Sequence, residues 1–573
     1  MEFALKSASR DAALSITSEE KDGVITARFK MTLPEAIPEK TTVSFDIDSA
    51  DAYSVWSPAP QNDRKLSPNW SCRRLDSKFA SWPPIYQVIS QSGKNRMCVA
   101  LSDPRIPAAI YSGIREEDAM IAFRIEFFTL PTNPISEYSC DIRIDMRDIP
   151  YYDAIYEGMS WMERVSGCEE CHIPEHAMLP MDSLWYSFHQ NLTPDEVLRE
   201  CALSKKLGME TVIIDDGWQT DDSSRGYAYC GDWEAKESKV GDMKTLVDGV
   251  HALGMKLILW YSVPFVGVYT KHFERFKGMF LEEEDAERKV YSLDPRYKKV
   301  REYLVSTYVR AKKEWGLDGF KLDFIDSFIL GGRALESDPA RDFESLEDGI
   351  DALLSEIKEA LTALDPDIMI EFRQTYIGPC IRKFGNMLRV WDCPADATVN
   401  RSNIIDMRYT SGGTPVHSDM LMWSVNSPVE AAATQFASAI FAVPQVSVKI
   451  WQLPEEHRRM IKFYLDFWRR HRDVLIGGKL TARNPEYNYS SARSRKDDTD
   501  VLALYDERIA EVENTHTIVV NASANTDMIL RNASGAAVRV VNCMGEPVFE
   551  GEVCGNLYEL EIPVSGIAFI DKK

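Results

Sequence analysis

Gly319-Phe-Lys-Leu-Asp-Phe-Ile-Asp326 is a stretch in which apolar and polar residues alternate. The alternation predicts a short buried β-strand, on which Lys321 and Asp323 share one face because side chains two apart point the same way. A neighbouring positive charge favours the ionised form of a carboxylate, which suits a nucleophile better than a general acid. Taken alone, such a pair is more often a structural ion pair, so its role depends on the rest of the chain.

Seven other short apolar runs lie between residues 180 and 476, with amphipathic helical segments between them. These runs are residues 184–189, 211–218, 256–262, 368–373, 388–392, 416–419 and 443–448. Strands that alternate with helices are typical of a parallel sheet, and eight such units over about 270 residues predict a (β/α)8 TIM barrel. A doubly wound open sheet is the alternative, but the sequence lacks the glycine-rich phosphate turn that would support it.

The segments on either side of the predicted barrel have the alternation of β-structure. Residues 1–150 contain many short strand-like stretches and predict a β-sandwich. Residues 151–179 connect it to the barrel at 180–476, whose last helix we expect near residues 454–475. Residues 477–573 predict a small antiparallel β-domain. The predicted fold class is therefore multidomain, α/β plus all-β.

The composition limits the classes of partner. The formal net charge of the 573-residue chain is −23 and no basic cluster stands out, so we expect neither nucleic acid nor an anionic membrane as a partner. Eleven sparse cysteines and the lack of a basic region followed by a long apolar run at the start predict a cytoplasmic protein.

One cysteine motif needs separate treatment. Cys168-Glu-Glu-Cys171-His172, with His176 close behind, has the spacing of c-type haem attachment and of half a zinc site. Haem attachment would require export, and the sequence has no second C-x-x-C to complete a zinc site. We therefore expect a connector with incidental cysteines, and neither a metal nor a cofactor.

Polar and aromatic residues gather at the C-terminal ends of the predicted strands, where TIM barrels carry their function. They are Trp185, His189, Asp215, Asp216, Trp218, Trp260, Lys321, Asp323, Glu371, Arg373, Asp392, His417 and Asp419. Only two histidines, His189 and His417, lie among these residues, which is too few for a metallohydrolase. The sequence also has neither a G-x-S-x-G elbow nor a phosphate-binding loop. Carboxylates with tryptophans suit a sugar, and two further carboxylates can cleave a glycosidic bond.

Three blocks of sequence resemble the signatures of the melibiase-type α-galactosidases, glycoside hydrolase family 36 of clan GH-D. They are Asp215-Asp216-Gly217-Trp218, Gly319-Phe-Lys321-Leu-Asp323 and Arg389-Val-Trp-Asp392. Trp260-Tyr-Ser-Val-Pro-Phe265 and the turn Gly231-Asp232-Trp233 are also similar to that group. The resemblance covers residues 180–475, and it implies the same order of β-sandwich, barrel and β-domain.

The resemblance implies that terminal α-galactosyl or related α-glycosyl residues are removed from small oligosaccharides or glycosides by a retaining double displacement. Asp323 occupies the position of the nucleophile and Asp392 that of the acid/base, whose pKa should be raised because it must be protonated at rest. The implied substrate-binding residues are Asp215, Asp216, Trp218, Asp232, Trp260, Lys321, Glu371, Arg373, His417 and Asp419. Asp326 is expected to have a structural or supporting role.

The sequence departs from the family pattern in two places. Asp396 follows shortly after Asp392 and is a rival for the acid/base. The segment Glu371-Phe-Arg373-Gln-Thr-Tyr376 stands where the galactosidases have a glycine-rich turn, so the sugar specificity stays open. A galactosyl transferase of the raffinose-synthase type, an α-N-acetylgalactosaminidase and a non-catalytic carbohydrate-binding protein are the alternatives. A small carbohydrate is the expected partner. Because barrel enzymes of this group commonly associate, a homo-oligomer is also left open.

Overall fold

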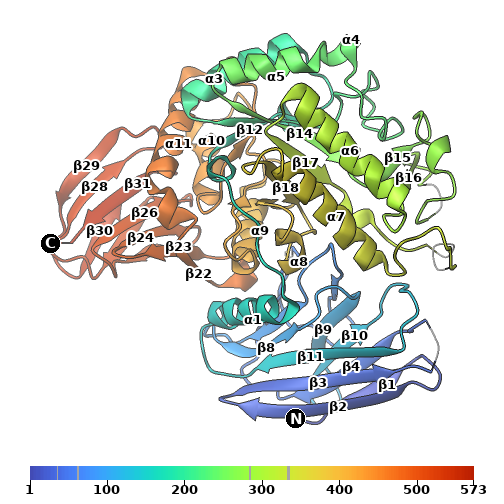
Figure 1. Ribbon diagram of the computed structural model, residues 1–573. Coiled ribbons are helices and arrows are strands. Elements are labelled where there is room, and N and C mark those ends of the chain that lie inside the picture. Colours follow the sequence, from blue (N-terminus) through green and yellow to red (C-terminus); the bar gives the residue numbers. More distant parts are fainter. Residues whose placement is uncertain (35–36, 61–62, 283–284, 332–335, 573) are drawn as a thin grey trace.

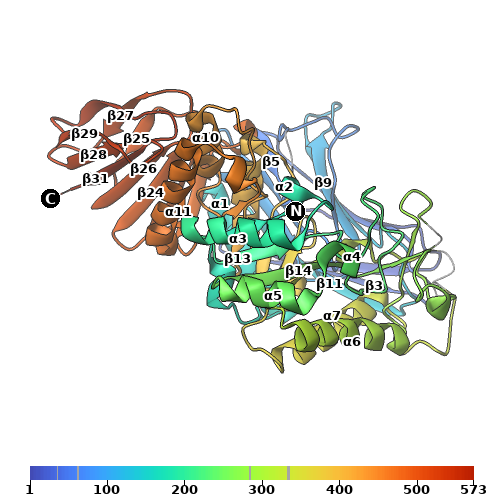
Figure 2. The ribbon, with the colours of Figure 1, turned by 90° about the horizontal axis from the view of Figure 1, so that it is seen from above.

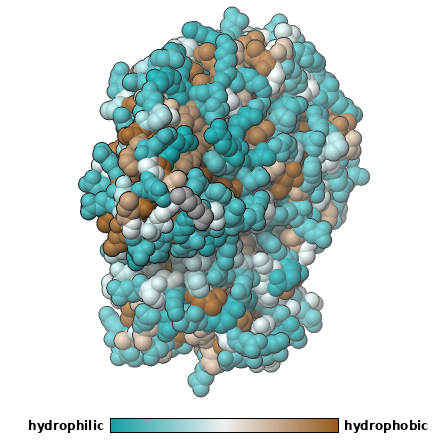
Figure 3. All heavy atoms as spheres, turned by 90° about the vertical axis from the view of Figure 1, so that its left-hand side faces the viewer, coloured by the Kyte–Doolittle hydropathy of each residue, from teal (hydrophilic) through white to brown (hydrophobic). Residues whose placement is uncertain are grey.

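The computed structural model describes residues 1–34, 37–60, 63–282, 285–331 and 336–572. Figure 1 shows a β-sandwich at the N-terminus, a central barrel with helices on its outside, and a second β-domain at the C-terminus. Within the described ranges, no helix is both long enough and apolar enough to cross a membrane. The face shown in Figure 3 is largely hydrophilic, with hydrophobic residues in small scattered groups.

The N-terminal domain is a sandwich of two sheets, in the orders β1-β4-β10-β9-β6 and β2-β3-β11-β8-β7-β5. The strands are β1 (Ala4–Ser7), β2 (Ala13–Lys21), β3 (Val24–Thr32), β4 (Thr41–Ile47), β5 (Ser54–Trp56), β6 (Leu75–Ser77), β7 (Ile85–Ile89), β8 (Asn95–Leu101), β9 (Ala108–Ile114), β10 (Ile121–Phe127) and β11 (Glu137–Asp145). Alternate side chains face the core, where the rings of Phe29 and Phe127 stack 5.1 Å apart. The pattern confirms the predicted sandwich.

The connector between sandwich and barrel contains a helix of its own, α1 (Tyr151–Ser166). It begins after Pro150 and ends at Gly167, which has the left-handed φ of 67° that favours glycine at a helix end. A short 3-10 helix, Glu175–Met178, then leads into the barrel. In Figure 1, α1 lies between the sandwich and the rest of the molecule.

Eight parallel strands form the barrel, in the order β20-β19-β18-β17-β14-β13-β12-β21. The elements are β12 (Met181–Ser183), α2 (Trp185–Phe188), α3 (Pro194–Leu207), β13 (Thr211–Ile214), α4 (Glu237–Val240), α5 (Met243–Ala252), β14 (Lys256–Ser262), β15 (Phe265–Gly267), β16 (Val290–Ser292), α6 (Lys298–Trp315), β17 (Gly319–Asp323), α7 (Leu346–Thr362), β18 (Met369–Arg373), α8 (Pro379–Arg382), β19 (Met387–Arg389), α9 (Ala397–Thr410), β20 (Val416–His417), α10 (Val429–Ser438), β21 (Gln445–Val446) and α11 (Glu455–Leu475). Figure 2 shows α3, α5, α6 and α7 along the outside of the sheet.

The two outermost strands of this sheet meet and close it. The N–H of Val443 donates to the carbonyl of Val416 at 2.8 Å, and the N–H of Ser418 donates to the carbonyl of Val443 at 3.0 Å. The N-terminal end of the barrel is filled by apolar side chains: Ala177, Met181, Ile213, Ile258, Met369 and Met387. The predicted TIM barrel is confirmed, with its apolar end opposite the polar strand ends.

The first barrel strand is not where the sequence predicts it. The strand is Met181–Ser183, and residues 185–188 of the predicted strand form the short helix α2. The backbone N–H groups of Tyr186 and Ser187 both donate to the hydroxyl of Ser447, which caps the turn from 260 residues away. The predicted start of α3 is confirmed, because the side chain of Thr193 accepts a hydrogen bond from the N–H of Glu196 and caps the helix.

The C-terminal domain pairs a seven-stranded sheet, β22-β23-β24-β26-β31-β28-β29, with a three-stranded sheet, β25-β27-β30. Its strands are β22 (Lys479–Arg483), β23 (Ser491–Lys496), β24 (Thr499–Leu504), β25 (Ile509–Glu511), β26 (His516–Asn521), β27 (Asp527–Arg531), β28 (Ala537–Val541), β29 (Pro547–Glu552), β30 (Leu557–Glu561) and β31 (Ile567–Asp571). The predicted antiparallel pairing holds except that β24 pairs with β26, and β25 with β27, in parallel.

The carboxylate of Asp406, on α9 of the barrel, joins all three parts of the chain. It accepts hydrogen bonds from Trp56 (2.7 Å) and Arg64 (3.0 Å) of the sandwich and from Tyr489 of the C-terminal domain. The side chains of Arg64 and Asp406 are only 1% and 2% exposed. A buried pair of this kind is costly to break, because the remaining charge has no water to solvate it.

Replacing Asp406 with alanine should lower the free energy of unfolding by about 3–5 kcal/mol, because the Arg64 guanidinium would stay buried without a counter-charge. The matched control is Asp466→Ala, which breaks an exposed ion pair with Lys462 and should cost less than about 1 kcal/mol. Urea unfolding followed by tryptophan fluorescence measures both. Equal midpoints for the two variants would contradict the role of this junction.

Candidate active site

The carboxylate of Asp323 lies at the C-terminal end of β17 and is surrounded by hydrogen-bond donors. It accepts from the indole N–H of Trp260 (2.7 Å), from Nε of Arg373 (2.7 Å), from the hydroxyl of Tyr376 and from the N–H of Phe324 (2.8 Å). The residue is 2% exposed. The site therefore holds one buried carboxylate with both oxygens bonded.

The surroundings of Asp323 stabilise its charged form. Burial raises the pKa of this carboxyl, but the charges of Arg373 and Lys321 and the hydrogen bonds of Tyr376 and Trp260 together hold its pKa below the ordinary value. At neutral pH the group is ionised. An ionised, buried carboxylate whose position is fixed suits attack on an electrophilic carbon or stabilisation of a positive charge.

Lys321 does not contact Asp323 as the sequence suggests. Its ammonium group forms an ion pair with Asp215, which lies beyond the end of β13, two strands along the sheet. The cation in direct contact with Asp323 is Arg373, from the neighbouring strand β18. The structural ion pair between Lys321 and Asp323, the alternative that the sequence left open, is thus replaced by pairs with other residues, and Lys321 lowers the pKa of Asp323 through its charge, as the sequence predicts.

Arg373 also reaches the second predicted catalytic carboxylate, Asp392. Its Nη1 lies 3.2 Å from Oδ2 of Asp392, which also accepts from Nε2 of Gln374 at 2.7 Å. Nη2 of Arg389 lies 2.8 Å from the other oxygen. The Asp392 side chain is 37% exposed, whereas that of Asp323 is 3% exposed. One guanidinium thus bridges a buried and a partly open carboxylate.

The pKa of Asp392 differs from the expectation for an acid/base. Burial raises it, but the charges of Arg389, Arg373 and Lys321 outweigh burial and hold the pKa at about 2. The raised pKa that the sequence led us to expect is therefore absent in this arrangement, in which Asp392 is ionised at neutral pH. The reason is the arginine pair, which the sequence motif does not reveal.

The rival carboxylate Asp396 has a different task. Its Oδ1 accepts hydrogen bonds from the backbone N–H groups of Thr398 (3.1 Å) and Val399 (2.9 Å), so it caps the start of α9. A carboxylate used as a helix cap is held by its helix, whereas Asp392 shares Arg373 with the nucleophile candidate. The geometry favours Asp392.

The Asp215-Asp216-Gly217-Trp218 turn supports the site from β13. Asp216 accepts from Gln190 (2.6 Å) and Gln219 (2.7 Å), and burial raises its pKa to about 6. Gly217 has a φ of 114°, and a Cβ there would lie 2.8 Å from the backbone of Gln190, so another residue would not fit. Asp215 stays next to Lys321, with 5% of its surface exposed.

The two predicted tryptophans are both buried, with Trp218 0% and Trp260 1% exposed. Trp260 donates directly to Asp323, and Tyr227 stacks on its ring at 6.2 Å. Trp218 donates its indole N–H to the carbonyl of Trp260 at 3.0 Å. Trp218 therefore supports Trp260, and the sugar contact that the sequence predicts for it stays a prediction.

Three other predicted substrate-binding residues are fully buried in the barrel. Glu371 accepts from Gln445, and His417 bonds to the carbonyl of Ala177 at 2.8 Å. Burial lowers the pKa of His417 to about 3, so its ring is neutral. Asp419 accepts from Arg389 at 2.6 Å. These contacts hold the three residues in place within the barrel, and the sugar contact that the sequence predicts for them stays a prediction.

Asp232 also lies apart from the carboxylates of the barrel. Its Oδ1 bonds to Nδ1 of His272 at 2.8 Å, and its Oδ2 accepts from the N–H of Lys271 at 3.1 Å. It thereby joins the segment that follows β13 to the one that follows β15. Trp185 begins α2 and His189 follows its end, with their rings 5.0 Å apart, and the guanidinium of Arg225 lies over the ring of Trp185.

The sequence named the segment that contains Gln374 and Tyr376 for its bearing on the sugar, but it did not predict their contacts with the candidate catalytic carboxylates, and it did not single out Arg288. Tyr376 and Gln374 lie in the loop after β18, and each bonds to one of the candidate catalytic carboxylates. The Arg288 guanidinium lies 5.7 Å from the ring of Phe324, directly after Asp323. Arg288 comes from a distant segment, and no pattern in the sequence points to it.

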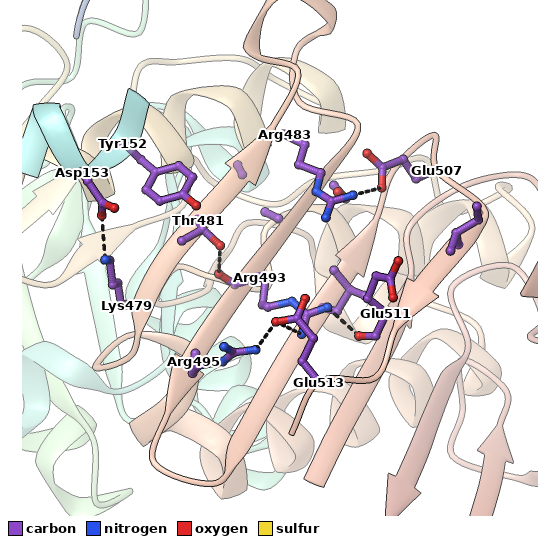
Figure 4. A pocket seen from close by; sticks show the side chains of 15 residues that line it. Tyr152, Asp153, Lys479, Thr481, Arg483, Arg493, Arg495, Glu507, Glu511 and Glu513 are labelled. Carbon is purple, nitrogen blue, oxygen red and sulfur yellow. Dashed lines mark hydrogen bonds and ion pairs between the residues drawn. The ribbon is translucent and has the colours of Figure 1, made fainter. Parts of the chain in front are cut away.

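A hollow of about 340 Å³ lies between α1 and the C-terminal domain, away from Asp323. Figure 4 shows that its charged side chains point toward one another. Lys479 pairs with Asp153 at 2.6 Å and Arg495 pairs with Glu513 at 2.7 Å. Because these charges neutralise one another, the hollow is a less suitable reaction site than the end of the barrel.

Residues 181–478, just over half of the chain, match the model of one protein family, Melibiase. The chain belongs to the Melibiase family. Among its curated relatives are the bifunctional α-galactosidase/sucrose kinase AgaSK of Mediterraneibacter gnavus, 32% identical over 86 residues (14% of this chain and 9% of that protein), and an α-galactosidase of Escherichia coli, 24% identical over 192 residues (31% and 27%). The matching segments thus span less than a third of either relative.

A solved structure shares the fold of this Melibiase-family chain almost throughout. The GH36 α-galactosidase AgaA of Geobacillus stearothermophilus superposes with a TM-score of 0.65 at 14% identity, over 98% of this chain and 81% of that one. The likeness extends over sandwich, barrel and C-terminal domain, and it agrees with the fold class predicted from the sequence. Family and fold are those of glycosidases.

The Tyr376 hydroxyl should stabilise this Melibiase-family protein only where Asp323 is ionised. Because the native pKa of Asp323 lies below its ordinary value, the contribution is present above about pH 4 and is lost as the pH falls through the native pKa. Tyr376→Phe should cost about 1.5–3 kcal/mol at pH 7 and progressively less as the pH falls through the native pKa of Asp323. Urea unfolding at a series of decreasing pH values measures it, with Tyr487→Phe, at an exposed tyrosine, as the control. A loss that stays constant down to the pH at which the wild type unfolds would assign the effect to packing.

Proposed function

We propose that this protein is a retaining glycoside hydrolase that removes terminal α-galactosyl, or closely related α-glycosyl, residues from small oligosaccharides or glycosides. The observation that carries the proposal is the ionised carboxylate of Asp323, bonded to Trp260, Arg373 and Tyr376 and linked through Arg373 to Asp392. Two carboxyl groups that flank one substrate bond are the requirement for glycosidic cleavage.

In the proposed reaction, Asp323 attacks the anomeric carbon while Asp392 gives a proton to the leaving oxygen. A covalent glycosyl-aspartate forms, and Asp392 then takes a proton from the water that hydrolyses it. The Asp215–Lys321 pair lies where β13 and β17 end and would bind sugar hydroxyls, and Trp260 would hold Asp323 in place through its indole N–H. The substrate must first weaken the contacts of Asp392 with Arg389 and Arg373, because the acid has to be protonated.

The loop at Gln374 to Tyr376 bears on the choice of sugar. It stands next to both candidate catalytic carboxylates, and its bulky side chains occupy the position of the glycine-rich turn of the galactosidases. A panel of nitrophenyl α-glycosides (galactoside, N-acetylgalactosaminide and glucoside) tests the proposal directly. Cleavage of the galactoside with the α-anomer as first product, seen by NMR, is expected. The β-anomer as first product would exclude the double displacement, and transfer to an added sugar would favour a transglycosylase.

Asp323→Ala should lower kcat/KM by about four orders of magnitude or more, because it removes the nucleophile of the first step. Added azide should restore part of the turnover and give the β-glycosyl azide, since a small anion can take the place of the carboxylate. Mass spectrometry and NMR of the product check this. A variant that keeps more than a tenth of the wild-type rate would contradict the assignment.

Asp392→Ala and Asp396→Ala separate the two candidates for the acid/base. With a nitrophenyl leaving group, Asp392→Ala should form the glycosyl-enzyme but hydrolyse it slowly, and azide should speed turnover and yield the α-glycosyl azide. Asp396→Ala should keep the wild-type pH profile and lose only about 1 kcal/mol of stability, the cost of a helix cap. Azide rescue of the Asp396 variant in place of the Asp392 variant would reverse the assignment.

A further inference from the structure

Two cysteines outside the candidate active site lie with their sulfur atoms close together. Cys168 follows α1 in the connector, and Cys380 is in α8, between β18 and β19. Their Sγ atoms are 3.8 Å apart and share a hydrogen bond. Because a disulfide bond is about 2.0 Å long, the sulfurs would need to approach by only about 1.8 Å.

The segments that carry the two cysteines are already fixed to each other. The N–H of Cys171 donates to the carbonyl of Arg382 at 3.0 Å. The Arg382 guanidinium forms ion pairs with Glu163 and Glu170, which lie on either side of Cys168 in the sequence. A disulfide here would therefore require little further ordering of the chain, although 212 residues separate its two cysteines.

The two thiols differ in reactivity. Cys168 is partly exposed and Cys380 is buried. The hydrogen bond with Cys380 lowers the pKa of Cys168 to about 6 despite burial, and the charges of Lys383 and Arg105 act in the same direction. The thiolate is the form of cysteine that oxidants attack. Cys168 is thus the accessible thiolate, and Cys380 lies in place to react with its product.

We propose that Cys168 is a site of oxidation by hydrogen peroxide, with Cys380 as the resolving thiol of a Cys168–Cys380 disulfide. The Cys168 thiolate attacks one peroxide oxygen, the O–O bond breaks, and hydroxide leaves and takes up a proton from solvent. The resulting sulfenic acid is attacked by the sulfur of Cys380. The S–O bond then breaks, and the departing oxygen leaves as water with the proton of Cys380. Two thiols are oxidised and one peroxide is reduced to two waters.

This chemistry gives a role to the first cysteine of the C-x-x-C-H motif that involves no metal. The disulfide would join the connector to the helix that follows the loop of Gln374 and Tyr376. Because Cys380 comes only four residues after Tyr376 in the sequence, the new bond would restrain the segment that holds Asp323 from one side.

The experiment treats the full-length reduced protein with a small excess of hydrogen peroxide, alkylates the remaining thiols and maps the peptides by mass spectrometry. We expect one cross-linked pair, Cys168–Cys380, with a mass loss of two hydrogen atoms that dithiothreitol reverses. In Cys168→Ser the pair should not form, and in Cys380→Ser a dimedone adduct should accumulate on Cys168. Cys171→Ser and Cys554→Ser are the controls and should oxidise like the wild type.

Three outcomes would overturn the proposal. They are a Cys168–Cys171 cross-link, an oxidation that occurs first at the exposed Cys554, and a wild-type protein in which Cys168 stays reduced while other thiols react. The wild-type peptide map decides between these outcomes by itself. The test therefore stands even if the buried Cys380→Ser variant does not fold.

Discussion

The charge of Arg373 is the constraint on which the geometry of the site depends. Its guanidinium lies between Asp323, at the end of β17, and Asp392, beyond the end of β19, and β18 itself lies between those two strands in the sheet. Without the cation the two carboxylates would repel each other, and without them the buried arginine would lack counter-charges. The order of the barrel strands thus places the cation between the two anions.

The N-terminal sandwich helps to hold this arrangement. The N–H of Trp82, in the sandwich, donates to the carbonyl of Thr375 at 2.8 Å, and Lys78 donates to the carbonyl of Asp326. The hydroxyl of Thr375 donates in turn to the carboxylate of Asp326, which agrees with the supporting role expected for that residue. The loop that carries Gln374 and Tyr376 is therefore fixed both by β17 and by another domain, and Asp406 keeps that domain against the barrel.

The sequence predicted what depends on local periodicity. Alternating strands and helices gave the barrel, and a capping residue followed by proline gave the start of α3 at Thr193. The sequence could not predict local structure that depends on a distant residue. The predicted first strand forms α2, in which the N–H of Tyr186 bonds to Ser447. The ion-pair partner of Asp323 is Arg373, which comes from another strand. The capping role of Asp396 could have been predicted from the sequence, because an aspartate directly before a helical segment is a common helix cap.

One arginine cannot favour both forms that the proposed chemistry needs, since Asp323 must be ionised and Asp392 protonated before cleavage. The two contacts differ in a way that resolves the conflict. Nε of Arg373 is 2.7 Å from the buried Asp323, whereas its Nη1 is 3.2 Å from Asp392, whose side chain is 37% exposed. The longer and more open contact is the one that a substrate oxygen can replace. Loss of it would remove one of the charges that lower the pKa of Asp392 and would leave the pKa of Asp323 low, because Tyr376 and Trp260 still donate to Asp323. The charge of Arg389, 2.8 Å from the other oxygen of Asp392, has the larger effect on that pKa. Protonation of Asp392 therefore requires that the bound sugar weaken both arginine contacts.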